Sequence, residues 1–124
     1  MANYVVWIDH DQAKLFELDV THETLHTVLR TEDINHHKGI ERERNKHKDL
    51  SKFFNDVTAQ LETAHQVLLI GPGLAKTHFK EHLDSPHHEA IGKKVVGVET
   101  VDHPTDGQIV ALAKKFFKAH LAFE

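Results

Sequence analysis

The sequence contains no cysteine, only three prolines, and one tryptophan and one tyrosine among its 124 residues. The lack of cysteine excludes disulfide bonds and thiolate zinc sites, and it suits a reducing compartment. No apolar run approaches the roughly 18 residues that a membrane span requires, and no basic and apolar leader pattern is present. Walker and dinucleotide-binding fingerprints and a Gly-x-Ser-x-Gly nucleophile elbow are also lacking. We therefore expect a cytoplasmic protein with no cofactor and no membrane partner.

Histidine is the residue type that the chain has in excess. Thirteen histidines accompany 15 Lys and Arg and 19 Asp and Glu, which gives a formal net charge of −4 at pH 7. This sign argues against a generic polyanion binder. Protonation of the imidazoles would reverse it, and the sequence pI of about 6.3 places that change close to neutrality. The length suits a single domain over residues 1–124.

The turn Gly71-Pro72-Gly73 carries the strongest local signal for the fold. It lies between the apolar run 67–70 and the helix-like stretch 74–83. Four consecutive apolar residues are typical of a strand covered on both faces, as in parallel α/β sheets. The pattern therefore predicts a buried strand, a tight turn whose glycines let the chain reverse, and a helix.

The same turn is a candidate anion site formed by Gly71, Gly73 and Lys76. Helix N-termini present unpaired N–H groups and partial positive charge, and Lys76 follows close behind the turn. The alternative is that the turn only allows the helix and the strand to pack closely. The lack of any phosphate-binding fingerprint favours this alternative.

The remaining apolar pattern predicts four more strands and three more helices. The strands cover 3–8, 13–18, 24–30 and 94–98. The first helix follows Asp49 as its N-cap and carries an apolar stripe at helical spacing: Leu50, Phe53, Phe54, Val57, Leu61 and Ala64.

Two later helices have recognisable start signals. Ser85 and Pro86 suit the N-cap and the first turn of a short helix that continues to Ile91. Thr105 and Gln108 have the spacing of a capping box at the start of a C-terminal helix. The buried stripe of that helix is predicted to contain Ile109, Leu112, Ala113, Phe116, Phe117 and Leu121. The predicted core includes Phe53, Phe54, Leu69, Phe79, Leu112 and Phe116.

A polar, charge-dense segment over 31–48 interrupts the pattern and is predicted to be a long exposed loop. Loops of this length inside compact domains are usually functional or disordered. Its basic side chains could contact phosphate, without aromatic residues for base stacking, although Glu41 and Glu43 dilute the charge and a solvated loop is the alternative. The candidate RNA-binding residues are His36, His37, Lys38, Arg42, Arg44, Lys46, His47 and Lys48.

The element order βββαβαβα predicts an α/β protein with a mixed five-stranded sheet and helices on both faces, the three-layer layout of ribonuclease H-like folds. Three segments resemble the middle domain of archaeal and eukaryotic class 1 release factors and of Pelota. Bacterial stand-alone translational machinery proteins of this group look particularly similar. The segments are 4–9 with 13–16, 53–57, and Leu68-Leu69-Ile70-Gly71-Pro72-Gly73 followed by Lys76, Phe79 and Leu83.

This resemblance implies a ribonuclease H-like fold and a connection to the ribosome. Release factors carry a Gly-Gly-Gln tip between the third strand and the first long helix. Here that interval, 35–48, contains Gly39 and no glutamine. Pelota lacks the tip and keeps a basic stretch, so the resemblance implies the Pelota-like variant, without peptide-release activity.

Two other functions stay open from the sequence. A metal-dependent nuclease of ribonuclease H-like fold would need clustered carboxylates, and Asp9 with Asp11, Asp102 and Asp106 could supply them. Turn and capping roles also explain most of these acids. An oligomeric interaction domain that binds no nucleic acid is the other alternative.

His78 and His82 share one helix face at i and i+4, a spacing at which imidazoles can hold zinc, although exposed histidines are the favoured interpretation. We expect a non-catalytic, translation-associated module that binds the ribosome or structured RNA, with a homo-oligomer left open.

Overall fold

The computed structural model describes residues 2–19, 23–30 and 46–121. The five strands are β1 (Ala2–Ile8), β2 (Gln12–Leu18), β3 (Glu23–Leu29), β4 (Ala64–Gly71) and β5 (Val95–Thr100). The helices are α2 (Lys46–Ala59), α3 (Ala75–Leu83), α4 (Glu89–Gly92) and α5 (Asp106–Leu121). None of the helices in these described ranges is long and apolar enough to cross a membrane.

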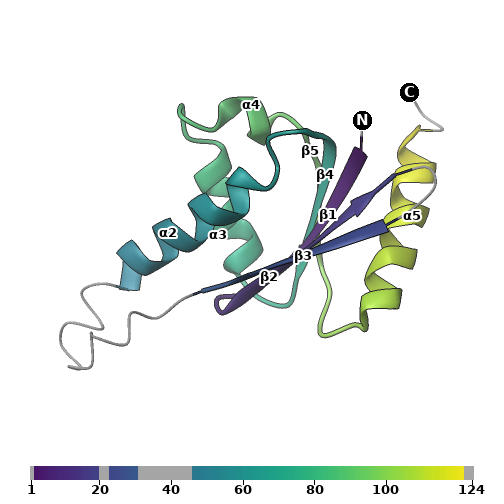
Figure 1. Cartoon of the computed structure of the whole chain (residues 1–124), viewed down its shortest axis with the longest axis horizontal. Coiled ribbons are helices and arrows are strands. Elements are labelled where there is room, and N and C mark those ends of the chain that lie inside the picture. Colours follow the sequence, from purple (N-terminus) through teal and green to yellow (C-terminus); the bar gives the residue numbers. More distant parts are fainter. Residues whose placement is uncertain (1, 20–22, 31–45, 122–124) are drawn as a thin grey trace.

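The strands form one mixed sheet in the order β3-β2-β1-β4-β5. The first three strands pair antiparallel, whereas β1 pairs parallel to β4 and β4 pairs parallel to β5. Figure 1 shows α2, α3 and α4 on one face of the sheet and α5 on the other. The predicted three-layer α/β fold, its mixed five-stranded sheet and its element order are therefore confirmed.

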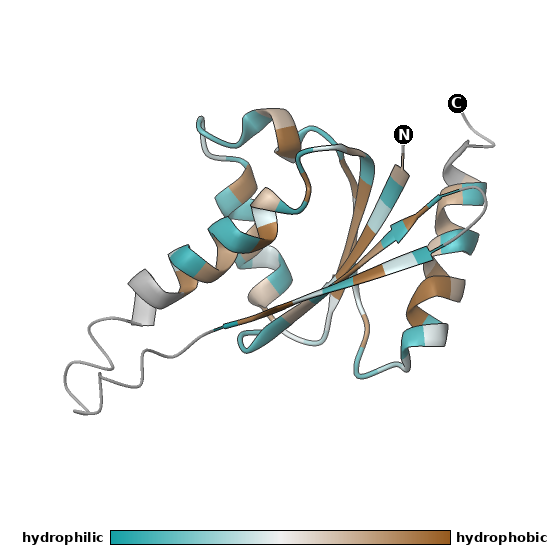
Figure 2. Cartoon of the chain, in the orientation of Figure 1, coloured by the Kyte–Doolittle hydropathy of each residue, from teal (hydrophilic) through white to brown (hydrophobic). Residues whose placement is uncertain are grey.

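Two apolar cores lie on the two faces of the sheet. Successive side chains of a strand point to opposite faces, so that Val6 and Ile8 face α2 and α3 whereas Val5 and Trp7 face α5. Figure 2 shows the resulting concentration of hydrophobic residues along the strands and on the helix sides that cover them. Because β1 and β4 are covered on both faces, they read as continuous apolar runs in the sequence.

The predicted core is confirmed for one helical layer and corrected for the other. Phe53, Phe54, Leu69 and Phe79 are buried, as expected. Leu112 and Phe116 are only half-buried, because the deepest face of α5 is one residue further round and carries Ala113 and Phe117. Phe116 instead covers Gly97, where an added Cβ would lie 2.7 Å from the Phe116 ring.

The bounds of α2 differ from the prediction at both ends. The helix already begins at Lys46, so Asp49 lies inside the helix and is not its N-cap. It ends at Ala59, and Ala64 opens β4 instead of extending the helical stripe. Leu61 fits the apolar spacing because it is buried, but it lies in the turn that follows the helix. In this turn the Leu61 N–H donates to the Thr58 carbonyl.

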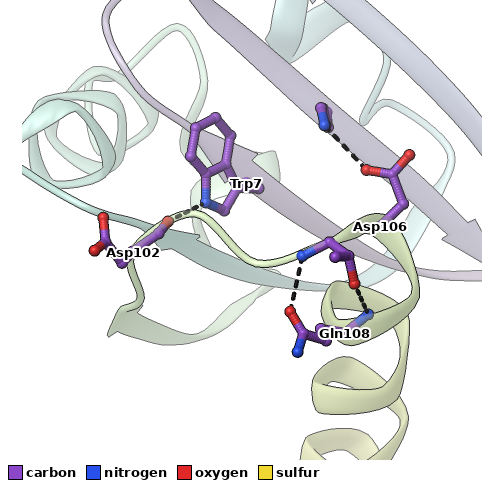
Figure 3. A network of polar contacts seen from close by, with 6 residues as sticks. Trp7, Asp102, Asp106 and Gln108 are labelled. Atoms are coloured by element: carbon purple, nitrogen blue, oxygen red, sulfur yellow. Dashed lines mark hydrogen bonds and ion pairs between the residues drawn. The ribbon is translucent and has the colours of Figure 1, made fainter.

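One helix start is wrong in the prediction and one is confirmed. Ser85 closes α3 by donating from its hydroxyl to the His82 carbonyl at 2.8 Å, and α4 starts only at Glu89. At α5 the capping box is present: the Gln108 N–H donates to the Thr105 hydroxyl, and the Thr105 N–H donates to the Gln108 side-chain oxygen (Figure 3).

Candidate functional site

A groove of about 970 Å³ lies on the face of the sheet that carries α2 and α3. We call it the α3 groove. The turn between β1 and β2 forms one part of its wall, the residue that follows β3 forms another, and α2 and α3 complete it. Its lining residues are His10, Asp11, Arg30, Leu50, Ser51, Phe54, His78, Glu81 and His82.

Backbone hydrogen bonds fix the turn and the strand end that border the α3 groove. The Arg30 N–H donates to the Asp11 carbonyl at 2.8 Å, which joins the end of β3 to the β1–β2 turn. The Arg30 guanidinium also donates to the His10 carbonyl at 3.3 Å. Asp9 closes the turn itself, because its carboxylate accepts the N–H groups of Asp11 and Gln12 at 2.8 and 2.9 Å.

The helix α3 presents three polar side chains to the groove at i, i+3 and i+4, which places them on one face. They are His78, Glu81 and His82, while Phe79 and Leu83 point into the core from the other side. The rings of His10 and His78 are neighbours, with centroids 5.9 Å apart and planes tilted by 51°. His78, one of the two histidines that were singled out from the sequence, therefore lies next to a third one, His10, in the turn between β1 and β2.

The α3 groove carries one guanidinium, two carboxylates and three imidazoles around the apolar side chains Leu50 and Phe54. Guanidinium groups such as that of Arg30 bind phosphate oxygens, and the apolar wall offers contact for a flat ring. Arg30 is therefore the one permanent cation that the described groove lining offers to an anion, and the carboxylates of Asp11 and Glu81 oppose its charge.

His82 is the most constrained group of the α3 groove. Its ring stacks on His88 at a centroid distance of 4.5 Å and lies against Phe54 and Phe79. Burial lowers the pKa of His82 below the ordinary value of 6.5, and the neighbouring His88 lowers it further. The buried Nε2 atom has no hydrogen-bond partner among the described residues. The folded protein therefore favours neutral His82.

This lowered pKa predicts a loss of stability in acid. Because the unfolded chain binds the His82 proton at a higher pH than the folded chain does, the contribution of His82 is fully present above about pH 6.5 and falls as the pH drops through the lowered pKa. We expect the urea midpoint to fall less between pH 7.5 and pH 5 in His82→Leu than in the wild type. The exposed His87, replaced by Leu, is the control and should retain the wild-type fall. An equal fall of the urea midpoint in all three proteins would contradict the assignment of this pH dependence to His82.

The four acids of the nuclease hypothesis are not gathered at one point. Asp11 lines the α3 groove, whereas Asp106 borders a hollow beneath α5 and pairs with Lys14 at 3.0 Å. Asp102 accepts the Trp7 indole N–H with its carbonyl (Figure 3), and its carboxylate contacts His103. In the described part of the chain, no three His, Cys, Asp or Glu side chains form a group that could hold a metal, His78 and His82 included. The geometry gives the nuclease no support.

At the predicted anion site, the side chain of Lys76 bonds back to the turn that precedes its helix. Lys76 is buried, and its ammonium donates to the Gly73 carbonyl at 2.5 Å. Gly71 stands where β4 approaches β1, since an added Cβ would lie 2.2 Å from the Ile8 carbonyl oxygen. Gly73 has open space and no positive φ, so the turn needs no special freedom there. Close strand packing explains Gly71, and anion binding stays a prediction.

The predicted RNA-binding segment falls mostly outside the described residues. His36, His37, Lys38, Arg42 and Arg44 lie in 31–45, which the structure does not describe. Lys46, His47 and Lys48 belong to the first turn of α2, not to a loop, although their side chains are also outside the description. Arg30, which directly precedes this segment, and the helix α2, in which the segment ends, both border the α3 groove.

Four groove residues were missed by reasoning from the sequence: His10, Arg30, Ser51 and Glu81. His10 lies between two acids that were considered, and Glu81 lies between two histidines that were considered. Polar residues directly after a predicted strand or on one polar helix face are the available signal. Their convergence depends on the packing of α2 against α3, which no local pattern contains.

Comparison with known proteins supports the fold. No protein-family model and no curated protein sequence matches the chain. Among solved structures, Archaeoglobus fulgidus Pelota superposes with a TM-score of 0.64 at 17% identity, over 92% of this chain and 31% of that one. Thermoplasma acidophilum Pelota gives 0.60 at 16% identity, over 86% of this chain and 30% of that one.

An archaeal translation termination factor, aRF1, gives a TM-score of 0.57 at 18% identity, over 98% of this chain and 41% of that chain. The chain thus spans about a third of the length of the structures that it matches. Its fold is that of one domain within Pelota and aRF1.

Proposed function

We propose that this chain is a translation-associated, non-catalytic module that binds the ribosome or another structured RNA through the α3 groove. One observation carries the proposal: the fold is shared with a domain of two kinds of protein, one of which is described as a translation termination factor. The interval 35–48 contains no Gly-Gly-Gln, so the proposal includes no peptide release. A cytoplasmic location and the contribution of the basic residues in 36–48 are part of the same proposal.

The Arg30 guanidinium and the basic segment that follows it in the sequence support RNA as the ligand class. Arg30 follows β3, directly before the basic segment, and His10 and His78 line the same groove. Phosphate contacts give affinity without sequence specificity, which suits binding to structured RNA through its backbone. The overall negative charge of the chain confines favourable contact to such a local site.

Equilibrium binding to a structured RNA, measured by fluorescence anisotropy at several salt concentrations, tests the proposal. We expect weaker binding by Arg30→Glu, with a slope of log K against log[salt] that is smaller by about one phosphate contact, roughly 0.9 for a duplex.

Lys93→Glu is the matched control, because it makes the same change in net charge at an exposed residue outside the groove. It should keep the wild-type affinity and slope. Equal losses in the two variants would show that only net charge matters and would remove the α3 groove from the proposal. Cleavage of the RNA with Mn²⁺ that is lost in Asp9→Asn would instead support the nuclease.

A further inference from the structure

The outer edge of β3 is a regular strand edge with exposed leucines. Among the described residues, β3 is the last strand on its side of the sheet, and it pairs with β2 over all seven of its residues without a register shift. Natural sheets usually protect such an edge with proline, lysine or a bulge. Between Glu23 and Arg30, β3 has none of these.

The direction of the backbone groups follows from one hydrogen bond. The Arg30 N–H donates to the Asp11 carbonyl on the β2 side. Because N–H and C=O groups alternate in direction along a strand, Val28 and His26 also turn theirs toward β2. Leu25, Thr27 and Leu29 therefore direct their backbone groups outward, toward the outer edge of β3.

The side chains of the same three residues lie together on the α5 face of the sheet. Leu25 pairs in register with Phe16, which belongs to the core beneath α5. Leu25 is nevertheless 46% exposed and Leu29 is 61% exposed, so α5 leaves them uncovered. They are two of the four large hydrophobic side chains that are exposed in the described part of the chain.

We propose that β3 pairs antiparallel with β3 of a second copy of this chain, with the two Thr27 residues opposite each other. A two-fold axis perpendicular to the sheet passes between the two Thr27 residues. Residues at equal distances before and after Thr27 then lie opposite each other, as isologous pairing requires. In this register Leu25 lies opposite Leu29 of the second copy, and Leu29 lies opposite Leu25 of the second copy. The outward backbone groups of all three residues then find partners, and the two sheets join into one.

The charges of the strand agree with this register. Arg30 comes to lie opposite Thr24, and His26 opposite Val28, so that no like charges oppose each other. Leu25 and Leu29 of the two copies together form one apolar patch between the two α5 helices. A single strand pair is small beside the roughly 1,200–2,000 Å² of stable interfaces, so we expect a weak dimer that forms as the protein concentration rises.

Charge substitutions test the partner and the register together by analytical ultracentrifugation. The wild type should approach twice the monomer mass of 14.2 kDa at high concentration. Leu25→Glu with Leu29→Glu places carboxylates opposite each other and should stay monomeric. Leu25→Lys with Leu29→Glu places opposite charges face to face and should dimerise again. Val98→Glu, at an exposed residue of the other edge strand, is the control and should dimerise like the wild type.

Single cysteines provide a test in a chain that otherwise has none. Opposed residues of a hydrogen-bonded antiparallel pair have Cα atoms about 5.5 Å apart, which a disulfide can bridge. Thr27→Cys should therefore form a covalent dimer under mild oxidation, whereas His26→Cys, its neighbour, should not. A wild type that is monomeric at every concentration, dimers lost in Val98→Glu but kept in the double-glutamate variant, or equal cross-linking of both cysteines would overturn the proposal.

Discussion

Phe79→Ala should lower the free energy of unfolding by about 3–5 kcal/mol, the range found for removing a fully buried phenylalanine. Phe79 has no exposed surface and contacts Phe54 and His82 between α3 and the sheet. Its removal leaves a cavity in the core cluster between the sheet and the helices on this face, which the neighbouring side chains cannot fill without moving. Because the total stability of a small domain is about 5–15 kcal/mol, this loss is a large fraction of it.

Phe116→Ala is the matched control for this prediction. The Phe116 ring is half-buried over Gly97, so its removal takes away less buried apolar surface. Phe116→Ala should therefore cost clearly less than Phe79→Ala. Urea midpoints of the two variants measure the difference, and Phe79→Leu preserves the comparison if Phe79→Ala does not fold. Equal midpoints, or a larger loss for Phe116→Ala, would mean that the core is assigned to the wrong face.

Gly71→Ala should be the other strongly destabilising single change. The added Cβ would lie 2.2 Å from the Ile8 carbonyl oxygen, and this neighbour is backbone in the central strand pair, which no side-chain rotation can relieve. We expect a cost of about 3 kcal/mol or more, at the upper end of the range for overpacking.

Gly73→Ala, two residues further on, provides the opposite expectation. Nothing lies within 4 Å of a Cβ at Gly73, and its φ is not positive. The substitution should be neutral or stabilising by about 0.4–1 kcal/mol, because it reduces the freedom of the unfolded chain. Thermal midpoints of both variants distinguish the two roles, and a similar loss in both would show that the turn itself, not the approach of β4 to β1, requires glycine.

The sequence was sufficient where a local pattern has one structural solution. Four apolar residues before Gly71 predict the buried β4, and Thr105 with Gln108 predicts the cap of α5; the structure confirms both. It was insufficient where a pattern continues past the element that it describes. Leu61 and Ala64 keep the helical spacing and are buried, yet Leu61 lies in the turn after α2 and Ala64 is the first residue of β4.

The α3 groove illustrates the limit for functional residues. His78 and His82 could be noted as a pair because they share one helix. Arg30 and His10 join them only through the pairing of β3 with β2 and the packing of α2 over the sheet, which are contacts between segments far apart in the chain. Such convergence is set by tertiary packing and leaves no spacing in the sequence.

Co-sedimentation with purified ribosomes tests the central claim most directly. At low salt we expect the wild type and Lys93→Glu to pellet with ribosomes through a sucrose cushion, and the bound fraction to fall as salt is added. Arg30→Glu combined with His78→Glu makes two lining residues of the α3 groove negatively charged. This variant, with its fold verified by circular dichroism, should stay in the supernatant. A wild type that stays in the supernatant at low salt, or a groove variant that pellets as well as Lys93→Glu, would contradict the account.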